Sequence, residues 1–171
     1  MDKAVMNAIM NEDTLKMVSQ LAGVDEKEAG SIVAAVLPTL LKGAASQNKN
    51  KDTAAGFLEA VLSHGEKDSS DMTKFIKNID TEDGAKIVKH LLGAGGDEKT
   101  AEAVAAKAKG IDTKKIIKIM AILAPIIMNQ LGKEAKKSGK KSNADMDGIL
   151  GTLVENVDLG DVLKIAKILI K

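Results

Sequence analysis

GIDTKKIIKIMAILAPIIMNQL, residues 110–131, is the most apolar run in this chain. An earlier stretch, GVDEKEAGSIVAAVLPTLLKG at residues 23–43, follows the same plan. Each stretch opens with Gly, an apolar residue and Asp, and each has a proline 15 positions after the glycine, at Pro38 and Pro125. Because matched spacing is typical of internal repeats, the sequence predicts a tandem duplication in which each half is centred on a proline-interrupted apolar helix.

The composition favours a single helical core. The chain has 171 residues, of which 44% are hydrophobic, and this suffices for one compact domain. It has two Phe and no Trp or Tyr, so Ile, Leu, Val, Met and Ala must fill an interior that suits closely packed helices. We therefore predict an all-α fold with one domain over residues 1–171, built from two roughly four-helix units at about 12–93 and about 97–171.

Apolar residues at helical spacing predict a series of helices joined by short polar segments. We expect Asp25 to cap the first central helix, with Glu28 as its capping-box partner, and Pro38 to kink or divide that helix near Leu37. We expect connectors at 46–51 and 138–144, a loop at 64–71 and a join between the halves at 93–96. The other expected helices are 2–10, 12–22, 52–63, 72–79, 82–92, 97–109, 112–137, 145–156 and 158–171.

These features together resemble a known bacterial family. The elements that carry the resemblance are the Gly-apolar-Asp openings, the apolar-Pro-apolar helices, a Lys-rich connector, an Asp-x-x-x-Gly-Phe-Leu helix and a closing Leu-Leu-Gly helix. The segment LAPIIMNQLGK, residues 123–133, is the most specific part. Over about residues 15–171 the chain is similar to the domain of unknown function 937 family of YidB-like proteins. The resemblance implies an all-helical fold and brings no catalytic residues to carry over.

Composition also limits the expected location and chemistry. The chain has no cysteine, which excludes disulfides, thiolate metal ligands and cysteine nucleophiles. The N-terminal sequence has no long apolar segment of the kind found in signal peptides, so we expect a cytoplasmic protein. Residues 116–128 are shorter than the roughly 20 apolar residues of a membrane span and contain Lys118, so a buried core helix is the preferred interpretation.

DNA binding is the alternative function that the sequence raises. Two sets of residues have the spacing of a helix-turn-helix, but an ordinary helical corner has the same spacing. The sets are Ser19, Gly23, Val24, Ala29 and Ile32, and Ala106, Gly110, Ile111, Ile116 and Ile119. All 25 basic residues are Lys, and the absence of Arg argues against base readout. The candidate contacts for nucleic acid or anionic lipid are lysines at the start of the second central helix and in the connector after it. The lysines near the helix C-terminus have an alternative explanation, because cations are favoured there by the helix dipole. The candidate lysines are Lys114, Lys115, Lys133, Lys136, Lys137, Lys140 and Lys141.

No other motif predicts catalysis or a cofactor. Residues 143–148 imitate the start of a calcium loop, but Val154 stands where the bidentate acid belongs, so a helix N-cap is the better interpretation and no metal is expected. The glycines at 93–96 lack a preceding strand and a Lys-Ser/Thr pair. His64 and His90 have no carboxylate at triad or metal spacing; solvent exposure is expected for His64, whereas His90 aligns with Ile168 and should be partly buried.

The sequence therefore favours a non-enzymatic interaction or structural protein with no cofactor. Tandem helical repeats offer matching faces that can stack, so we expect self-assembly into homo-oligomers or polymers, or binding to another protein. Residues 158–171 form an amphipathic segment that suits either a membrane surface or, preferably, the core of the second half.

Overall fold

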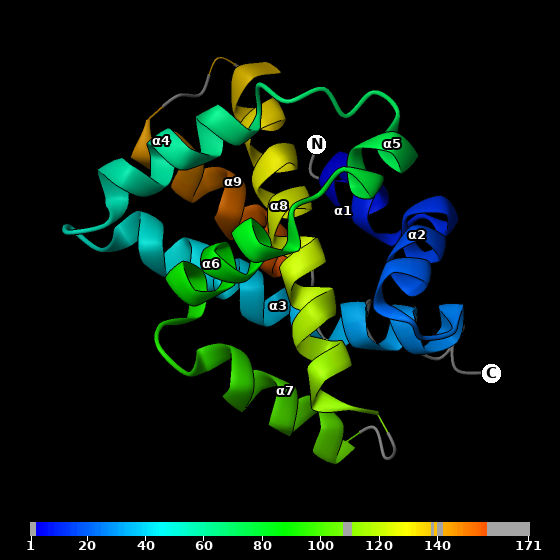
Figure 1. Ribbon diagram of the computed structural model, residues 1–171. Helices are drawn as coiled ribbons and strands as arrows, with labels where there is room; N and C mark the ends of the chain where they lie inside the picture. Colours follow the sequence, from blue (N-terminus) through cyan, green and yellow to red (C-terminus); the bar gives the residue numbers. More distant parts are fainter. Residues whose placement is uncertain (1–2, 108–110, 138, 140–141, 157–171) are drawn as a thin grey trace.

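The computed structural model describes residues 3–107, 111–137, 139 and 142–156, and in this part of the chain the fold is all-α without strands. Figure 1 shows the helices gathered around α8, which runs through the middle of the molecule. The predicted helix at 158–171 lies outside the described residues. The helices are α1 (Lys3–Met10), α2 (Glu12–Ala22), α3 (Glu26–Lys49), α4 (Ala54–His64), α5 (Met72–Lys77), α6 (Thr81–Leu92), α7 (Gly96–Lys107), α8 (Thr113–Lys137) and α9 (Asn143–Asn156).

Local end signals fix the early helices as predicted. The Asn11 side chain accepts a hydrogen bond of 2.8 Å from the Thr14 backbone N–H at the start of α2. Gly23 ends α2 with φ +72°, a conformation that few residues other than glycine adopt. Asp25 caps α3 by accepting from the Glu28 N–H at 2.8 Å, as predicted.

Both central helices continue past their proline. Pro38 lies within α3 and Pro125 within α8, so of the two predicted outcomes near Leu37, a kink or a division, the division does not occur. The predicted connector at 46–51 is also wrong over most of its length, because α3 extends to Lys49. The reason is a long-range contact: the Asn48 side chain is buried and donates to the Asn143 carbonyl at 2.8 Å, while the Asn143 amide donates to Asn48 Oδ1 at 2.7 Å and to the Ala54 carbonyl at 2.9 Å.

The core lies along α8 and α3. Ile119, Ile122 and Ile126 of α8 have no exposed surface, and neither do Ile32 and Leu37 of α3. Each of these helices packs mainly against elements far away in the sequence. α8 packs against α4 and α6, whereas α3 packs against α9 as well as its neighbour α2.

Among the residues that the structure describes, two helices, α3 and α8, are long and apolar enough to cross a membrane, each with a mean hydropathy of 1.4 over its most apolar window. Of these windows, 61% of residues in α3 and 78% in α8 are buried inside the protein. Such burial is also what the core helices of a folded domain show.

The contact between α6 and α8 depends on the proline of α8. Pro125 has no N–H to donate to the Ala121 carbonyl one turn earlier, so this carbonyl lacks its usual helical donor. Gly84 of α6 packs directly on this carbonyl, and a Cβ at position 84 would overlap the Ala121 oxygen. The backbone of α6 therefore approaches α8 more closely than any larger residue would allow.

Candidate functional site

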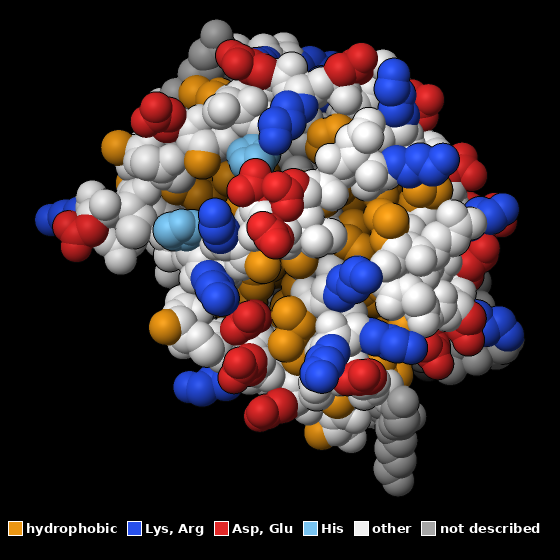
Figure 2. All heavy atoms as spheres, in the orientation of Figure 1, with side chains coloured by type: hydrophobic (Ala, Val, Ile, Leu, Met, Phe, Trp, Pro, Cys, Tyr) orange, Lys and Arg blue, Asp and Glu red, His pale blue; other side chains and the backbone are white. Residues whose placement is uncertain are grey.

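Two hollows meet at His64 on the face shown in Figure 2, where both histidines lie near a group of acidic side chains and apolar side chains are visible in the recesses. We call the first hollow the His64 pocket; its volume is about 370 Å³. The second hollow, of about 350 Å³, lies between α4 and α6. The His64 pocket is lined by His64, Lys67, Asp68, Asp71, Lys74, Phe75, Asn78, Ile79, Asp80, Asp83 and Pro125.

His64 is the last residue of α4 and is half-buried, so the prediction of an exposed loop histidine is wrong. Its backbone carbonyl accepts a hydrogen bond of 2.8 Å from the amide of Asn129, a fully buried residue of α8 that also donates to the Lys67 carbonyl at 3.1 Å. Its Nδ1 is buried, and no group in the described part of the chain hydrogen-bonds to it. Burial lowers the pKa of His64 below its usual 6.5, and the nearby Lys67 lowers it further, whereas Asp83 opposes the shift.

Most carboxylates around the pocket already have backbone or side-chain partners. Asp71 caps α5 by accepting from the Lys74 N–H at 3.2 Å, and Asp80 caps α6 by accepting from the Glu82 N–H at 2.9 Å. Asp68 accepts from both the hydroxyl and the N–H of Ser70, and these bonds lower the pKa of the Asp68 carboxyl. Asp83 is different, because only its backbone N–H takes part in the cap of α6.

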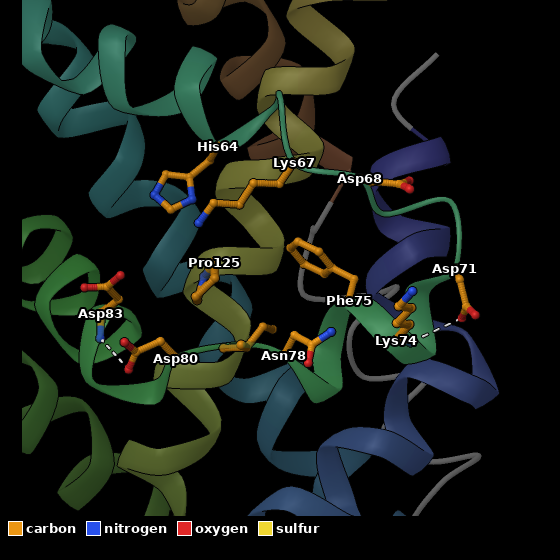
Figure 3. A pocket seen from close by; sticks show the side chains of 11 residues that line it. His64, Lys67, Asp68, Asp71, Lys74, Phe75, Asn78, Asp80, Asp83 and Pro125 are labelled. Atoms are coloured by element: carbon orange, nitrogen blue, oxygen red, sulfur yellow. Dashed lines mark hydrogen bonds between the residues drawn. The ribbon is translucent and has the colours of Figure 1, made fainter.

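Figure 3 shows how these groups lie around the pocket. The Lys67 side chain extends toward His64, and Asp80 and Asp83 lie on one side of Pro125. Phe75 lies on the other side of Pro125, with Lys74 and Asp71 beyond it, and Asp68 points away. The pocket therefore combines an apolar floor with charges of both signs.

Both aromatic residues of the chain line these hollows. Phe75 lines the His64 pocket, and Phe57 lines the second hollow together with Ile87 and Met128. Phe57 is 8% exposed and Phe75 is half-buried, so both have most of their surface covered by the protein. His90, also part of the second hollow, is exposed, contrary to the prediction of partial burial.

The structure does not bring the candidate lysines together. Lys114 and Lys115 lie at the start of α8, and Lys133, Lys136 and Lys137 lie near its end, about 27 Å further along a helix that rises about 1.5 Å per residue. Lys115 donates to the Gly23 carbonyl at 3.0 Å, and Lys136 pairs with Glu66 at 3.5 Å. Lys140 and Lys141 lie outside the described residues. Figure 2 likewise shows lysines and acidic residues interspersed over this face.

The helix-turn-helix-like corner and the calcium-loop-like segment have structural roles in the described part of the chain. The corner between α2 and α3 is closed by the Gly23 and Val24 N–H groups, which both bond to the Ser19 carbonyl at 2.9 and 3.1 Å. Its exposed helix start carries Glu26 and Glu28, which would face phosphate; the matching corner includes residues 108–110, which are not described.

Residues 143–148 form the first turns of α9 rather than a loop. No group of three or more potential metal ligands occurs among the described residues.

Sequence reasoning missed the His64 pocket. No motif in the sequence marks Lys67, Asp80 or Asp83 as a site residue. They converge on His64 through the packing of α4 and α6 on α8, and no local spacing encodes that packing. The restriction of the aromatic residues to Phe57 and Phe75 was the one signal that pointed to these surfaces.

The comparisons with known proteins identify a family and no activity. A family model described as a bacterial protein of unknown function, DUF937, matches residues 4–134, in agreement with the resemblance found in the sequence. No curated protein and no solved structure matches the chain.

Proposed function

Since the chain belongs to the bacterial family DUF937, for which no activity is described, we propose a role from its own geometry. The protein is a non-enzymatic structural protein of the cytoplasm that self-associates by exchanging its two halves between molecules. The observation that carries this proposal is the packing of each central helix against helices of the opposite half. α8 lies against α4 and α6, and α3 lies against α9.

The proposal treats the chain as a duplication with halves at about 12–93 and 97–171. Both halves begin with the same order of helices in the described residues. A helix of 11 or 12 residues, α2 or α7, precedes a proline-containing helix of 24 or 25 residues, α3 or α8. A shorter helix, α4 or α9, follows. The packing of α2 on α3 and of α7 on α8 supports the same correspondence.

Buried polar contacts between the halves favour exchange over unspecific association. Asn48 of α3 and Asn143 of α9 bond reciprocally, and Asn129 of α8 donates to the His64 and Lys67 carbonyls. A complex in which these amides had no hydrogen-bond partner would be less stable, because buried polar groups need hydrogen bonds. A second copy of this chain supplies the same partners.

The join between the halves is suited to such an exchange. Residues 93–95 connect α6 to α7, and all three are exposed. Gly93 and Gly95 have φ of +81° and +77°, so they hold the chain in a sharp turn. If this turn opens, the first half of one molecule can pack with the second half of another, forming closed dimers or open chains.

Light scattering during size-exclusion chromatography at several protein concentrations tests the proposal. Deleting Ala94 shortens the join and should increase the oligomer fraction, whereas inserting Gly-Ser after Ala94 should decrease it. The same insertion after the exposed Ser70, within the first half, is the control and should leave the distribution unchanged. A monomer at every concentration for both the natural chain and the shortened variant would contradict exchange.

DNA binding has less support as an alternative. The candidate lysines lie at opposite ends of α8, and Lys115 and Lys136 already have protein partners. An electrophoretic mobility shift at low salt would reveal binding, and its loss at higher salt would identify contacts to phosphate.

A further inference from the structure

The His64 pocket contains two opposite charges that do not neutralise each other. Lys67 comes from the loop after α4, and Asp83 comes from the first turn of α6. Both are close enough to His64 to shift its pKa in opposite directions. Within the described residues, however, Lys67 and Asp83 form no ion pair with each other or with any other group, although such pairs occur elsewhere, as between Lys49 and Asp147.

Two opposite charges that line one pocket without forming an ion pair match a ligand that carries both signs at neighbouring atoms. From this geometry we propose that the His64 pocket binds a free α-amino acid with an apolar side chain. The ammonium group of the ligand lies against the Asp83 carboxylate, and its carboxylate lies against the Lys67 ammonium. Charge-assisted hydrogen bonds of this kind are stronger than neutral ones.

The other charged groups of the pocket are less suited to these two contacts. Asp80 and Asp71 already cap helices, and Asp68 already accepts from Ser70. Lys74 lies beyond Phe75 and away from His64 (Figure 3). Asp83 and Lys67 therefore remain as the pair available to a ligand.

The apolar floor provides the place for the side chain of the ligand. Asp83 and Phe75 lie on opposite sides of Pro125 (Figure 3), and Ile79 also lines the pocket, so a side chain extending from the charged groups would cover apolar surface. The volume of about 370 Å³ is within the range of sites for small ligands, which begins at about 300 Å³. Leucine, valine or phenylalanine fits this combination of charge and shape better than an acidic or basic amino acid does.

Nuclear magnetic resonance titration of the full ¹⁵N-labelled chain with L-leucine tests the proposal. We expect saturable shifts of the amide signals of Lys67, Phe75 and Asp83. N-acetyl-L-leucine lacks the ammonium and L-leucinamide lacks the carboxylate, so each should bind about tenfold more weakly, the loss expected from one charged contact. L-Glutamate should also bind more weakly, because its side chain would bring charge onto the apolar floor.

Variants then assign each contact. Asp83→Asn should bind leucine about tenfold more weakly and should no longer distinguish leucine from its N-acetyl analogue, whereas Lys67→Gln should no longer distinguish leucine from leucinamide. Glu82→Gln and Lys77→Gln change neighbouring exposed residues outside the pocket and should bind like the natural chain.

Two results would overturn the proposal. One is the absence of saturable shifts with leucine, and the other is equal binding of leucine and both blocked analogues. The proposal does not depend on self-association, since monomers and oligomers alike contain the pocket.

Discussion

The two central helices, α3 and α8, follow one sequence plan but differ in their surroundings. Each begins after a capping aspartate, since Asp25 accepts from the Glu28 N–H and Asp112 accepts from the Lys114 N–H at 2.9 Å. Their first turns have opposite charge, with Glu26 and Glu28 in α3 and lysines in α8. α8 also contributes Pro125 and Met128 to the two hollows, whereas α3 contributes only Gln47 near its end.

This difference shows how one pattern serves two purposes. A proline in a buried helix removes one backbone donor, and in α8 the free carbonyl becomes the place where α6 packs through Gly84. The same region of α8 forms the floor of the His64 pocket. α3 also has a proline and an apolar face, but in the described residues its side chains mainly fill the hydrophobic core and form little of either hollow.

Separating the halves should have the largest effect. Fragment 1–95 loses α9 and α8 from the surface of α3, and fragment 96–171 loses α4 and α6 from the surface of α8, so each alone should lack a cooperative unfolding transition. Mixed together, they should recover the helical circular dichroism and the transition of the intact chain. A folded 96–171 fragment would show that α8 does not need α4 and α6.

Substituting Gly84 should be the most damaging single change. In Gly84→Ala the new Cβ overlaps the Ala121 carbonyl, which belongs to rigid backbone, and the free energy of unfolding should fall by about 3 kcal/mol. Gly56→Ala in α4 is the control, because nothing lies within 4 Å of its Cβ, and it should raise the free energy of unfolding by about 0.5 kcal/mol. Urea denaturation measures both, and equal effects would argue against the close approach.

Removing the buried amide of α8 should have an intermediate effect. Asn129→Ala leaves the His64 and Lys67 carbonyls without their donor and should lower the free energy of unfolding by about 2 kcal/mol. Asn48→Ala makes the equivalent test on α3, where the reciprocal bonds to Asn143 are lost. If both variants unfold like the natural chain, the amides do not hold the halves together.

Changing the charges in the first turns of α3 and α8 should have small effects of opposite sign on the free energy of unfolding. Lys114→Glu puts a negative charge at the positive end of the α8 dipole and should raise the free energy of unfolding by about 0.5 kcal/mol, whereas Glu26→Lys should lower it similarly in α3. Both effects should shrink in high salt. Thermal unfolding at two salt concentrations checks them, and matching signs would contradict a dipole effect.

Acidification should destabilise the fold through His64 of α4, which lines the pocket together with Pro125 of α8. Its native pKa lies below 6.5, so the unfolded chain binds the proton first, and the free energy of unfolding should fall as the pH drops through 6.5 toward the native pKa. Above this window the contribution is fully present. His64→Gln should flatten the dependence between pH 7 and the native pKa, and the exposed His90→Gln is the control. An unchanged profile for His64→Gln would contradict the effect.

Local signals account for what the sequence predicted well. The bounds of α2 follow from Asn11 and Gly23, and the start of α3 follows from Asp25, because capping depends only on residues within one turn. The failures come from distant contacts. Ser46 to Asn48 resemble a connector, yet α3 continues because Asn48 meets Asn143, 95 positions away. The His64 pocket was missed for the same reason, since its parts come from α4, α5, α6 and α8.

The placement of the only two aromatic residues, one in each hollow, gives the protein a built-in spectroscopic label. If the protein is produced with fluorophenylalanine in place of phenylalanine, it should give two ¹⁹F resonances, from positions 57 and 75. Each resonance would report on a different recess, so occupancy of either one could be followed in the purified protein without a further tag.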